Sequence, residues 1–270
     1  MIAKGSLRPA NRLDRTDTEV ITRALGMKRR NCAQIGLTAA LALAAAGAAA
    51  APAKIDIVAF GLWGDQSVFA SEAEGAARVI ARQFGPVDKV VVRANTKRGG
   101  EATEDNLRTT LAALGAKMDP ERDLLFLVLT SHGDPEGVGV ETQGQRSLIT
   151  PIELRTMLRE SGARLSVVIV SACYSGVFAD AMAEPDTLVI TAADDDHASF
   201  GCRDGAKWTS FGEAFFNDAL TKTKSLPAAF ALARGLVAER EQAEGFDPSN
   251  PQMAGGRRVL QLLGDQLQPH

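Results

Sequence analysis

The chain has 270 residues, of which 45% are hydrophobic and 23% charged, enough for one sizeable globular core. Its formal net charge is −3, but the first 53 residues carry eight Lys or Arg and only three acids, which leaves the remainder at −8. An acidic body without a basic stripe argues against a nucleic-acid partner, because phosphate binding needs a basic surface. Three cysteines are too few for a disulfide scaffold, and neither a CxxC pair nor a histidine cluster gives zinc-ligand spacing, so we expect no metal.

Residues 1–53 are typical of a leader rather than of a folded domain. Lys28-Arg29-Arg30 precedes an apolar run from Ile35 to Ala50, and Ala51-Pro52-Ala53 follows with small residues. This order predicts a secretory signal peptide cut after Ala53, with Met27 as the true start and an exported product, periplasmic or extracellular. The alternative is an uncleaved signal anchor, which would be the chain's one link to a membrane.

From Lys54 onward, short apolar runs alternate with amphipathic segments, which predicts a single domain over residues 54–270. Strands are expected at Ile55–Phe60, Lys89–Arg93, Leu124–Leu129, Leu165–Val170 and Thr187–Thr191. Helices are expected at Ala70–Phe84, Thr103–Leu114, Pro151–Ser161, Ser210–Leu220 and Leu226–Gln242. A short hairpin is expected from Gly137–Glu141 and Ser147–Thr150, and a surface loop from Glu244 to Arg257. Such alternation indicates an α/β sandwich with a mostly parallel sheet.

Two of these strands end in chemically reactive turns. Leu124–Leu129 leads to Ser131-His132-Gly133, and Leu165–Val170 leads to Ala172-Cys173-Tyr174-Ser175-Gly176. Ligands of open α/β sheets bind outside the carboxyl ends of the strands, so on neighbouring strands His132 and Cys173 would converge. A thiol beside an imidazole is a nucleophile–base pair, and the amides of Gly133 and Cys173 are natural oxyanion donors. Each residue also has a plainer interpretation, the cysteine as a small buried hydrophobe and the histidine as part of a turn.

At these turns the sequence resembles the C13 peptidases, the legumain family of the caspase-like clan. Ser131-His132-Gly133 is similar to the family's His-Gly motif, and Ala172–Gly176 to its Ala-Cys-x-Ser-Gly motif. Further similarity at Thr191–Cys202 and Thr209–Phe215 extends the resemblance over about Ile55 to Leu220. The resemblance implies a caspase-like three-layer sandwich, peptide or protein substrates, and no metal or cofactor. It also implies that Cys173 is the nucleophile and His132 the general base of an acyl-enzyme mechanism.

The same resemblance implies that the specificity pocket is walled by the loop after the first strand and by Ser199–Asp204. Legumain-type enzymes select asparagine with a basic side chain after the first strand, but Gly64–Ser71 contains no Arg or Lys, so this preference is not carried over. Ser199 and Asp204 are candidate substrate-binding residues, with a solvated carboxylate as the alternative for Asp204.

Several alternatives stay open at this point. His197 beside Asp194-Asp195-Asp196 could be read as a metal site, although a solvated turn is the simpler interpretation. Cys202 is interpreted as structural or as a pocket wall, and a regulatory bond to Cys173 has no support in the sequence. A catalytically silent binding module and a transpeptidase that uses the same pair compete with the endopeptidase, and the oligomeric state is left open.

Overall fold

The computed structural model describes residues 54–264, so the predicted signal segment and its cleavage site lie outside the described residues. All described residues belong to one compact unit. Within residues 54–264, no helix is long and apolar enough to cross a membrane.

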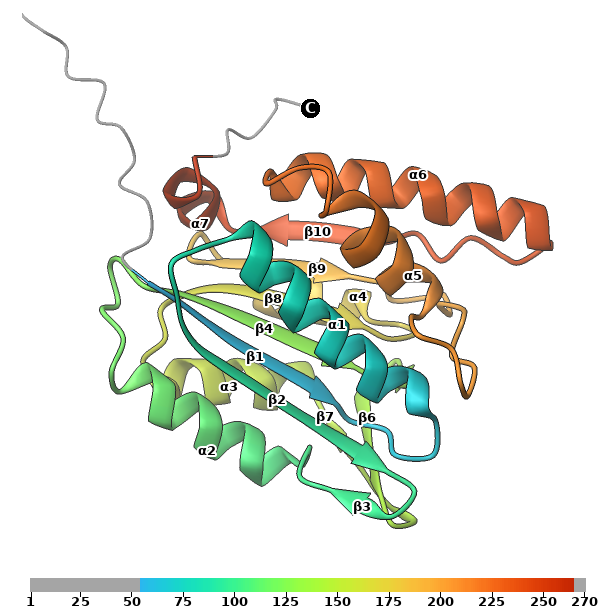
Figure 1. The fold of residues 1–270 in the computed structure, drawn as a ribbon, viewed down its shortest axis with the longest axis horizontal. Coiled ribbons are helices and arrows are strands. Elements are labelled where there is room, and N and C mark those ends of the chain that lie inside the picture. Colours follow the sequence, from blue (N-terminus) through green and yellow to red (C-terminus); the bar gives the residue numbers. More distant parts are fainter. Residues whose placement is uncertain (1–53, 265–270) are drawn as a thin grey trace, which may run out of the picture. The chain divides into compact units, whose positions relative to one another are not determined.

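A seven-stranded sheet with the order β10-β9-β8-β4-β1-β2-β3 forms the centre of this unit (Figure 1). Its strands are β1 (Ile55–Gly61), β2 (Val87–Thr96), β3 (Gly99–Gly100), β4 (Leu124–Thr130), β8 (Leu165–Ser171), β9 (Thr187–Thr191) and β10 (Gln252–Gly255). The strands from β9 to β2 are parallel, and β3 and β10 pair antiparallel to β2 and β9. Every residue of β1, β4 and β8 is buried, as expected for central parallel strands covered on both faces.

Helices cover both faces of the sheet and give three layers (Figure 1). One face packs against α1 (Ser67–Gln83), the π-helix η1 (Glu213–Ala219), α6 (Leu226–Glu244) and α7 (Arg257–Leu262). The other packs against α2 (Glu104–Gly115), α3 (Pro151–Ser161) and α4 (Gly176–Met182). Side chains of each strand alternate between the two cores: Ile57 and Phe126 belong to the first, and Val58 and Leu127 to the second.

A second, three-stranded sheet follows β4 directly. It consists of β5 (Gly133–Asp134), β6 (Gly137–Thr142) and β7 (Gln145–Ile149), all antiparallel. The predicted hairpin is therefore confirmed, with its turn at Gln143 and Gly144, both at positive φ. This sheet lies immediately beyond the end of β4, which is where the sequence places His132.

Local sequence signals explain most of the elements. Thr150 and Glu153 form a capping box, with Pro151 in the first turn, so α3 begins where the sequence predicts it. Thr103 caps α2 by accepting a hydrogen bond from the Asn106 amide, also as predicted.

Three expectations need correction. The predicted loop from Glu244 to Arg257 contains β10, which has no β-branched residue and depends on pairing with the edge of β9. The predicted helix Ser210–Leu220 is a short α-helix, α5 (Ser210–Gly212), that continues as the π-helix η1. The short helices α4 and α7 were not predicted, since six or seven residues carry little periodicity.

Candidate active site

The ends of β4 and β8 bring the two reactive turns together. The strands are parallel neighbours in a register that pairs Thr130 with Ser171, and His132 and Cys173 each follow two residues later. The Ser131 amide continues the pairing by donating to the Ser171 carbonyl at 3.2 Å. A Cβ on Gly133 would lie 2.3 Å from the Cys173 carbonyl oxygen, so the backbones of the two turns touch and only glycine fits. Both side chains therefore start from the same edge of the sheet.

The His132 imidazole is held on three sides. The rings of Trp63 and Phe69 each meet it edge-on, with ring centroids 5.1 Å away. Gln66, which immediately precedes α1, bonds to Nε2 through its side-chain oxygen, and its Nε2 donates to the Cys202 carbonyl at 3.0 Å. Because the amide oxygen only accepts, Nε2 of His132 carries the proton and Nδ1 keeps its lone pair in the neutral ring. This tautomer is a base at Nδ1.

Two effects lower the pKa of His132 below its usual range. Burial disfavours the charged ring, and the positive charge of Arg146 on β7 adds to this. Arg146 stacks over Trp63 with its guanidinium carbon 4.9 Å from the ring centroid, so the cation and the imidazole share one aromatic neighbour. Histidine is thereby kept in its neutral, basic form.

The half-buried Cys173 thiol is held by one backbone segment. Its Sγ accepts from the Ser199 amide and donates to the Ser199 carbonyl, both at 3.3 Å. Burial raises the pKa of Cys173, and hydrogen bonds from the backbone partly oppose this. The turn that follows is sharp, because Tyr174 adopts a left-handed conformation (φ 53°) uncommon for a non-glycine residue. In this structure the thiol is therefore neutral and directed at Ser199.

The acidic turn after β9 supports the turn that carries Cys173. The His197 carbonyl accepts from the Tyr174 amide at 2.9 Å, and the Asp194 carbonyl accepts from the Gly176 amide at 3.3 Å. The Asp194 carboxylate bonds to His197 Nδ1 at 2.7 Å and to Asn250 Nδ2 at 3.0 Å. Across residues 54–264, no group of three or more His, Cys, Asp or Glu side chains is arranged to hold a metal ion. This turn braces the residues that follow Cys173.

Comparison with protein families gives one decisive match. A model of the Peptidase C13 family matches residues 101–257, which include both reactive turns. The chain belongs to the peptidase C13 family. A search of curated protein sequences gives no significant match.

Solved structures show that this C13 chain has a caspase-like fold. Caspase-1 from Spodoptera frugiperda superimposes with a TM-score of 0.52 at 11% identity, covering 75% of this chain and 86% of that one. The structure of pro-sf-caspase-1 gives a TM-score of 0.51 at 13% identity, covering 75% of this chain and 90% of that one. At such low identity the likeness concerns the fold alone.

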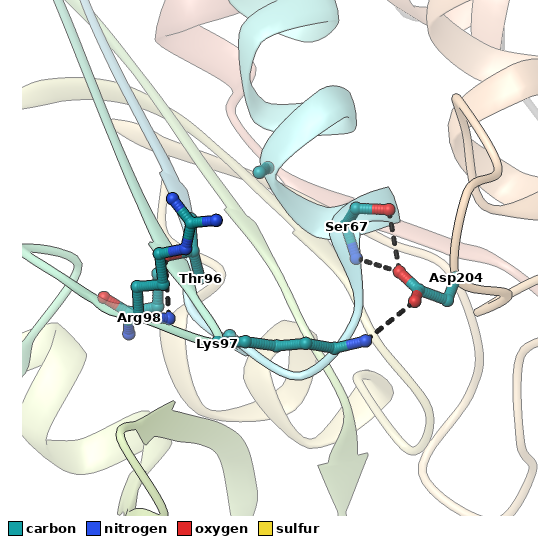
Figure 2. A pocket seen from close by; sticks show the side chains of 8 residues that line it. Ser67, Thr96, Lys97, Arg98 and Asp204 are labelled. Atoms are coloured by element: carbon teal, nitrogen blue, oxygen red, sulfur yellow. Dashed lines mark hydrogen bonds and ion pairs between the residues drawn. The ribbon is translucent and has the colours of Figure 1, made fainter.

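Two cavities lie near the candidate site of this C13 domain. One, of about 430 Å³, is lined by His132 and Gly133 together with Trp63, Arg146 and Leu148. The other, of about 370 Å³, is lined by Ser67, Lys97, Arg98 and Asp204 (Figure 2). Gln66 and Ser67 are adjacent, so the second cavity is one residue away from the side chain that contacts His132.

The structure gives Asp204 partners that the sequence did not indicate. Its carboxylate accepts from the amide and hydroxyl of Ser67 at 2.9 and 2.8 Å and pairs with Lys97 at 2.9 Å (Figure 2). These contacts lower the pKa of Asp204 far below its usual range. A basic side chain thus reaches this C13 cavity from the turn after β2, far in sequence from the Gly64–Ser71 segment that lacks one.

Sequence reasoning missed Gln66, Lys97 and Glu72. All three lie before residue 101, outside the segment that the family model matches. Gln66 and Lys97 are polar residues in turns, with no periodicity or motif to mark them. Glu72 did carry a signal, because it falls between Ala70 and Ala73 on a helix whose apolar face packs on the sheet.

Proposed function

We propose that this C13 family member is a cysteine endopeptidase in which Cys173 is the nucleophile and His132 the base. The observation that carries the proposal is the register of β4 and β8, which starts both side chains from one edge of the sheet. The Gln66 contact supports it, because it leaves Nδ1 of a neutral imidazole available to accept a proton.

The proposed reaction proceeds in two steps. His132 Nδ1 takes the thiol proton as Sγ of Cys173 attacks the peptide carbonyl, and the amides of Gly133 and Cys173 donate to the oxyanion. Collapse breaks the C–N bond, and His132 returns the proton to the leaving amine, which leaves an S-acyl enzyme. A water then attacks the thioester carbonyl with His132 as base, which releases the carboxylic acid and restores the thiol.

The same proposal places the substrate carbonyl beside Sγ of Cys173. Because Sγ bonds to the Ser199 backbone in this structure, the thiol must move away from Ser199 to reach the substrate carbonyl. Active-site contacts often reach their working geometry only when substrate binds. Ser199 and Asp204 are then the proposed substrate-binding residues. The Lys97–Asp204 pair offers a donor and an acceptor side by side, so it can contact a polar side chain of either hydrogen-bonding type.

Peptide-library profiling of the protein that begins at Lys54 tests this function. We expect cleavage that Cys173→Ala abolishes and His132→Ala lowers by at least about 100-fold. Cys202→Ala is the matched thiol control and should retain activity, since the Cys202 thiol has no role in the proposed reaction. Iodoacetamide should modify Cys173 faster than Cys202, and His132→Ala should slow the first reaction only.

Two other outcomes would select the competing functions. Alkylation of Cys173 no faster than that of a surface thiol and insensitive to His132→Ala would indicate a silent binding module. Products that carry an added amine nucleophile at the new carboxyl end would indicate a transpeptidase. Loss of cleavage in Cys202→Ala would contradict the proposal that Cys173 is the only thiol that takes part in the reaction.

We also propose that the protein is exported through the signal segment ending at Ala53. The support is the order of basic, apolar and small residues between Lys28 and Ala53. Amino-terminal sequencing of the protein secreted by a bacterial host should find Lys54 first. A product that retains the apolar run and sediments with membranes would instead identify an uncleaved anchor.

A further inference from the structure

Glu72 is a fully buried carboxyl group beneath the reactive turns. It lies in the second turn of α1 on the face that packs against the sheet, and its exposed fraction is zero. Among the described residues, its hydrogen-bond partners are hydroxyl and amide groups, and none is a Lys, Arg or His. Burial raises the pKa of Glu72, which shows how unfavourable this position is for a charge. A group this costly to bury calls for a structural or functional account.

Its two oxygens reach the ends of both strands that carry the proposed dyad. Oε1 accepts from the hydroxyl of Thr130, the last residue of β4, at 2.9 Å. Oε2 accepts from the Thr209 amide at 2.7 Å, and the Thr209 hydroxyl meets the hydroxyl of Ser171, the last residue of β8, at 3.1 Å. Each of these strand ends is two residues from His132 or Cys173. One carboxyl group therefore holds both strand ends, directly in β4 and through Thr209 in β8.

The start of α5 is built around the same carboxyl group. Thr209 caps this helix by accepting from the Gly212 amide at 2.9 Å. A Cβ on Gly212 would lie only 2.0 Å from Glu72 Oε2, so a side chain there would displace the carboxylate. Thr209 also ends the loop that begins at Ser199, whose backbone holds the Cys173 thiol. Glu72 thus fixes the far end of the segment that contacts the nucleophile.

We propose that Glu72 is a positioning residue that sets the separation of His132 and Cys173, because it hydrogen-bonds the end of β4 directly and the end of β8 through Thr209 at the start of α5. It touches neither the thiol nor the imidazole, so it acts through Thr130, Ser171 and Thr209. The inference rests on the proposed dyad and adds to it a residue outside the matched family segment.

Three substitutions at Glu72 test the hydrogen-bonding role. Glu72→Ala should lower kcat about 10- to 100-fold with KM within about twofold of wild type, because misplacement of catalytic groups slows chemistry more than binding. Glu72→Gln should restore kcat to within about threefold, since its amide can accept from the Thr209 amide and donate to the Thr130 hydroxyl. Glu74→Gln, an exposed position on the same helix, is the matched control and should be indistinguishable from wild type.

A double-mutant cycle measures the positioning without needing a peptide substrate. Iodoacetamide modification of the Cys173 peptide is followed by mass spectrometry in wild type, His132→Ala, Glu72→Ala and the double variant. His132→Ala should slow modification about tenfold in wild type and less than about twofold in the Glu72→Ala background. An equal effect of His132→Ala in both backgrounds would overturn the inference, because the two residues would then act independently.

Thr130→Val tests the positioning role of Glu72 even if Glu72→Ala fails to fold. The substitution keeps the shape of the side chain and removes only the hydroxyl that donates to Glu72, so a folded protein with kcat lowered about three- to tenfold is expected. Its control is Thr156→Val on α3, where the hydroxyl bonds to the Ile152 carbonyl away from the site. Unchanged kcat in Thr130→Val, or an equal loss in Glu72→Gln and Glu72→Ala, would overturn the inference. If His132→Ala leaves the rate of Cys173 alkylation at the wild-type value, the proposed dyad is wrong and both proposals fail.

Discussion

Ionisable groups at the two ends of the central sheet have different kinds of partner. Beyond the amino ends of β4, β8 and β9, Arg164 and Arg258 bind Asp186 at 2.7 and 2.9 Å, and Arg258 also binds Glu121 at 2.7 Å. At the carboxyl ends, the buried Glu72 meets only hydroxyl and amide groups in the described chain, and His132 keeps one nitrogen free.

The difference separates an ion-paired edge from the edge that carries the proposed dyad. The amino-end ion pairs are partly exposed and mutually neutralised, so they tie loops together without leaving a reactive group. Glu72 is buried and His132 is half-buried, and neither has an opposite charge among its hydrogen-bond partners, so ion pairing does not offset the cost of charging them. Perturbed groups of this kind gather at functional sites.

The largest expected effect is at Gln66. Gln66→Ala removes the acceptor that fixes His132 Nε2, so kcat/KM should fall about 100-fold, equivalent to about 2.7 kcal/mol of transition-state stabilisation. Steady-state kinetics on the best library peptide measures this. Gln242→Ala, an exposed position on α6, is the control. A loss of less than threefold would mean that the ring is oriented without Gln66 and would weaken the contrast between the two edges.

Gly212 tests how tightly the carboxyl-end network is packed. Gly212→Ala forces a methyl group against the Glu72 carboxylate and should lower the free energy of unfolding by about 1–3 kcal/mol. Gly235→Ala is the matched control, because its Cβ meets nothing within 4 Å on helix α6 and should be neutral or stabilising by up to about 1 kcal/mol. Urea unfolding monitored by tryptophan fluorescence compares them. Equal effects would show that the network tolerates repacking.

A substitution at the amino-end edge of the sheet should change the stability of the protein and leave the reactivity of Cys173 unchanged. Arg258→Ala breaks pairs with Asp186 and Glu121 and should cost up to about 1 kcal/mol of unfolding free energy, less at high salt. Its rate of Cys173 alkylation should equal that of wild type. Slower alkylation would contradict the difference between the two edges, because it would show that the ion pairs at the amino ends affect the reactivity of Cys173.

The smallest expected effect is a pH shift at Arg146. Burial and the charge of Arg146 lower the pKa of His132, so the neutral ring persists below the usual 6.5, and the proposed activity should fall as pH drops through that lowered value. Arg146→Gln removes a positive charge and should raise this pKa, which moves the acid limb of the kcat/KM profile to higher pH. Arg122→Gln, an exposed site elsewhere, is the control. A downward shift would contradict the stated electrostatics.

Many features of the fold were determined locally and could be predicted. The strands β1, β4 and β8 are continuous apolar runs, and the capping box at Thr150 and the cap at Thr103 mark where α3 and α2 begin. The two reactive turns follow such runs, so their place at the carboxyl edge of a parallel sheet could be derived from the chain alone. The strand β10 could not, because Gln252–Gly255 becomes extended only by pairing with β9.

The sequence by itself thus determined which residues can do chemistry and at which edge they stand, because apolar periodicity and strand-end position are local properties. Only the tertiary structure decided what surrounds them: Gln66 on His132, Ser199 on the Cys173 thiol, Lys97 on Asp204, and Glu72 beneath both strand ends. These contacts join residues from 26 to 137 positions apart in the chain. Side chains separated so far carry no mutual signal in sequence, and folding alone brings them within hydrogen-bonding distance.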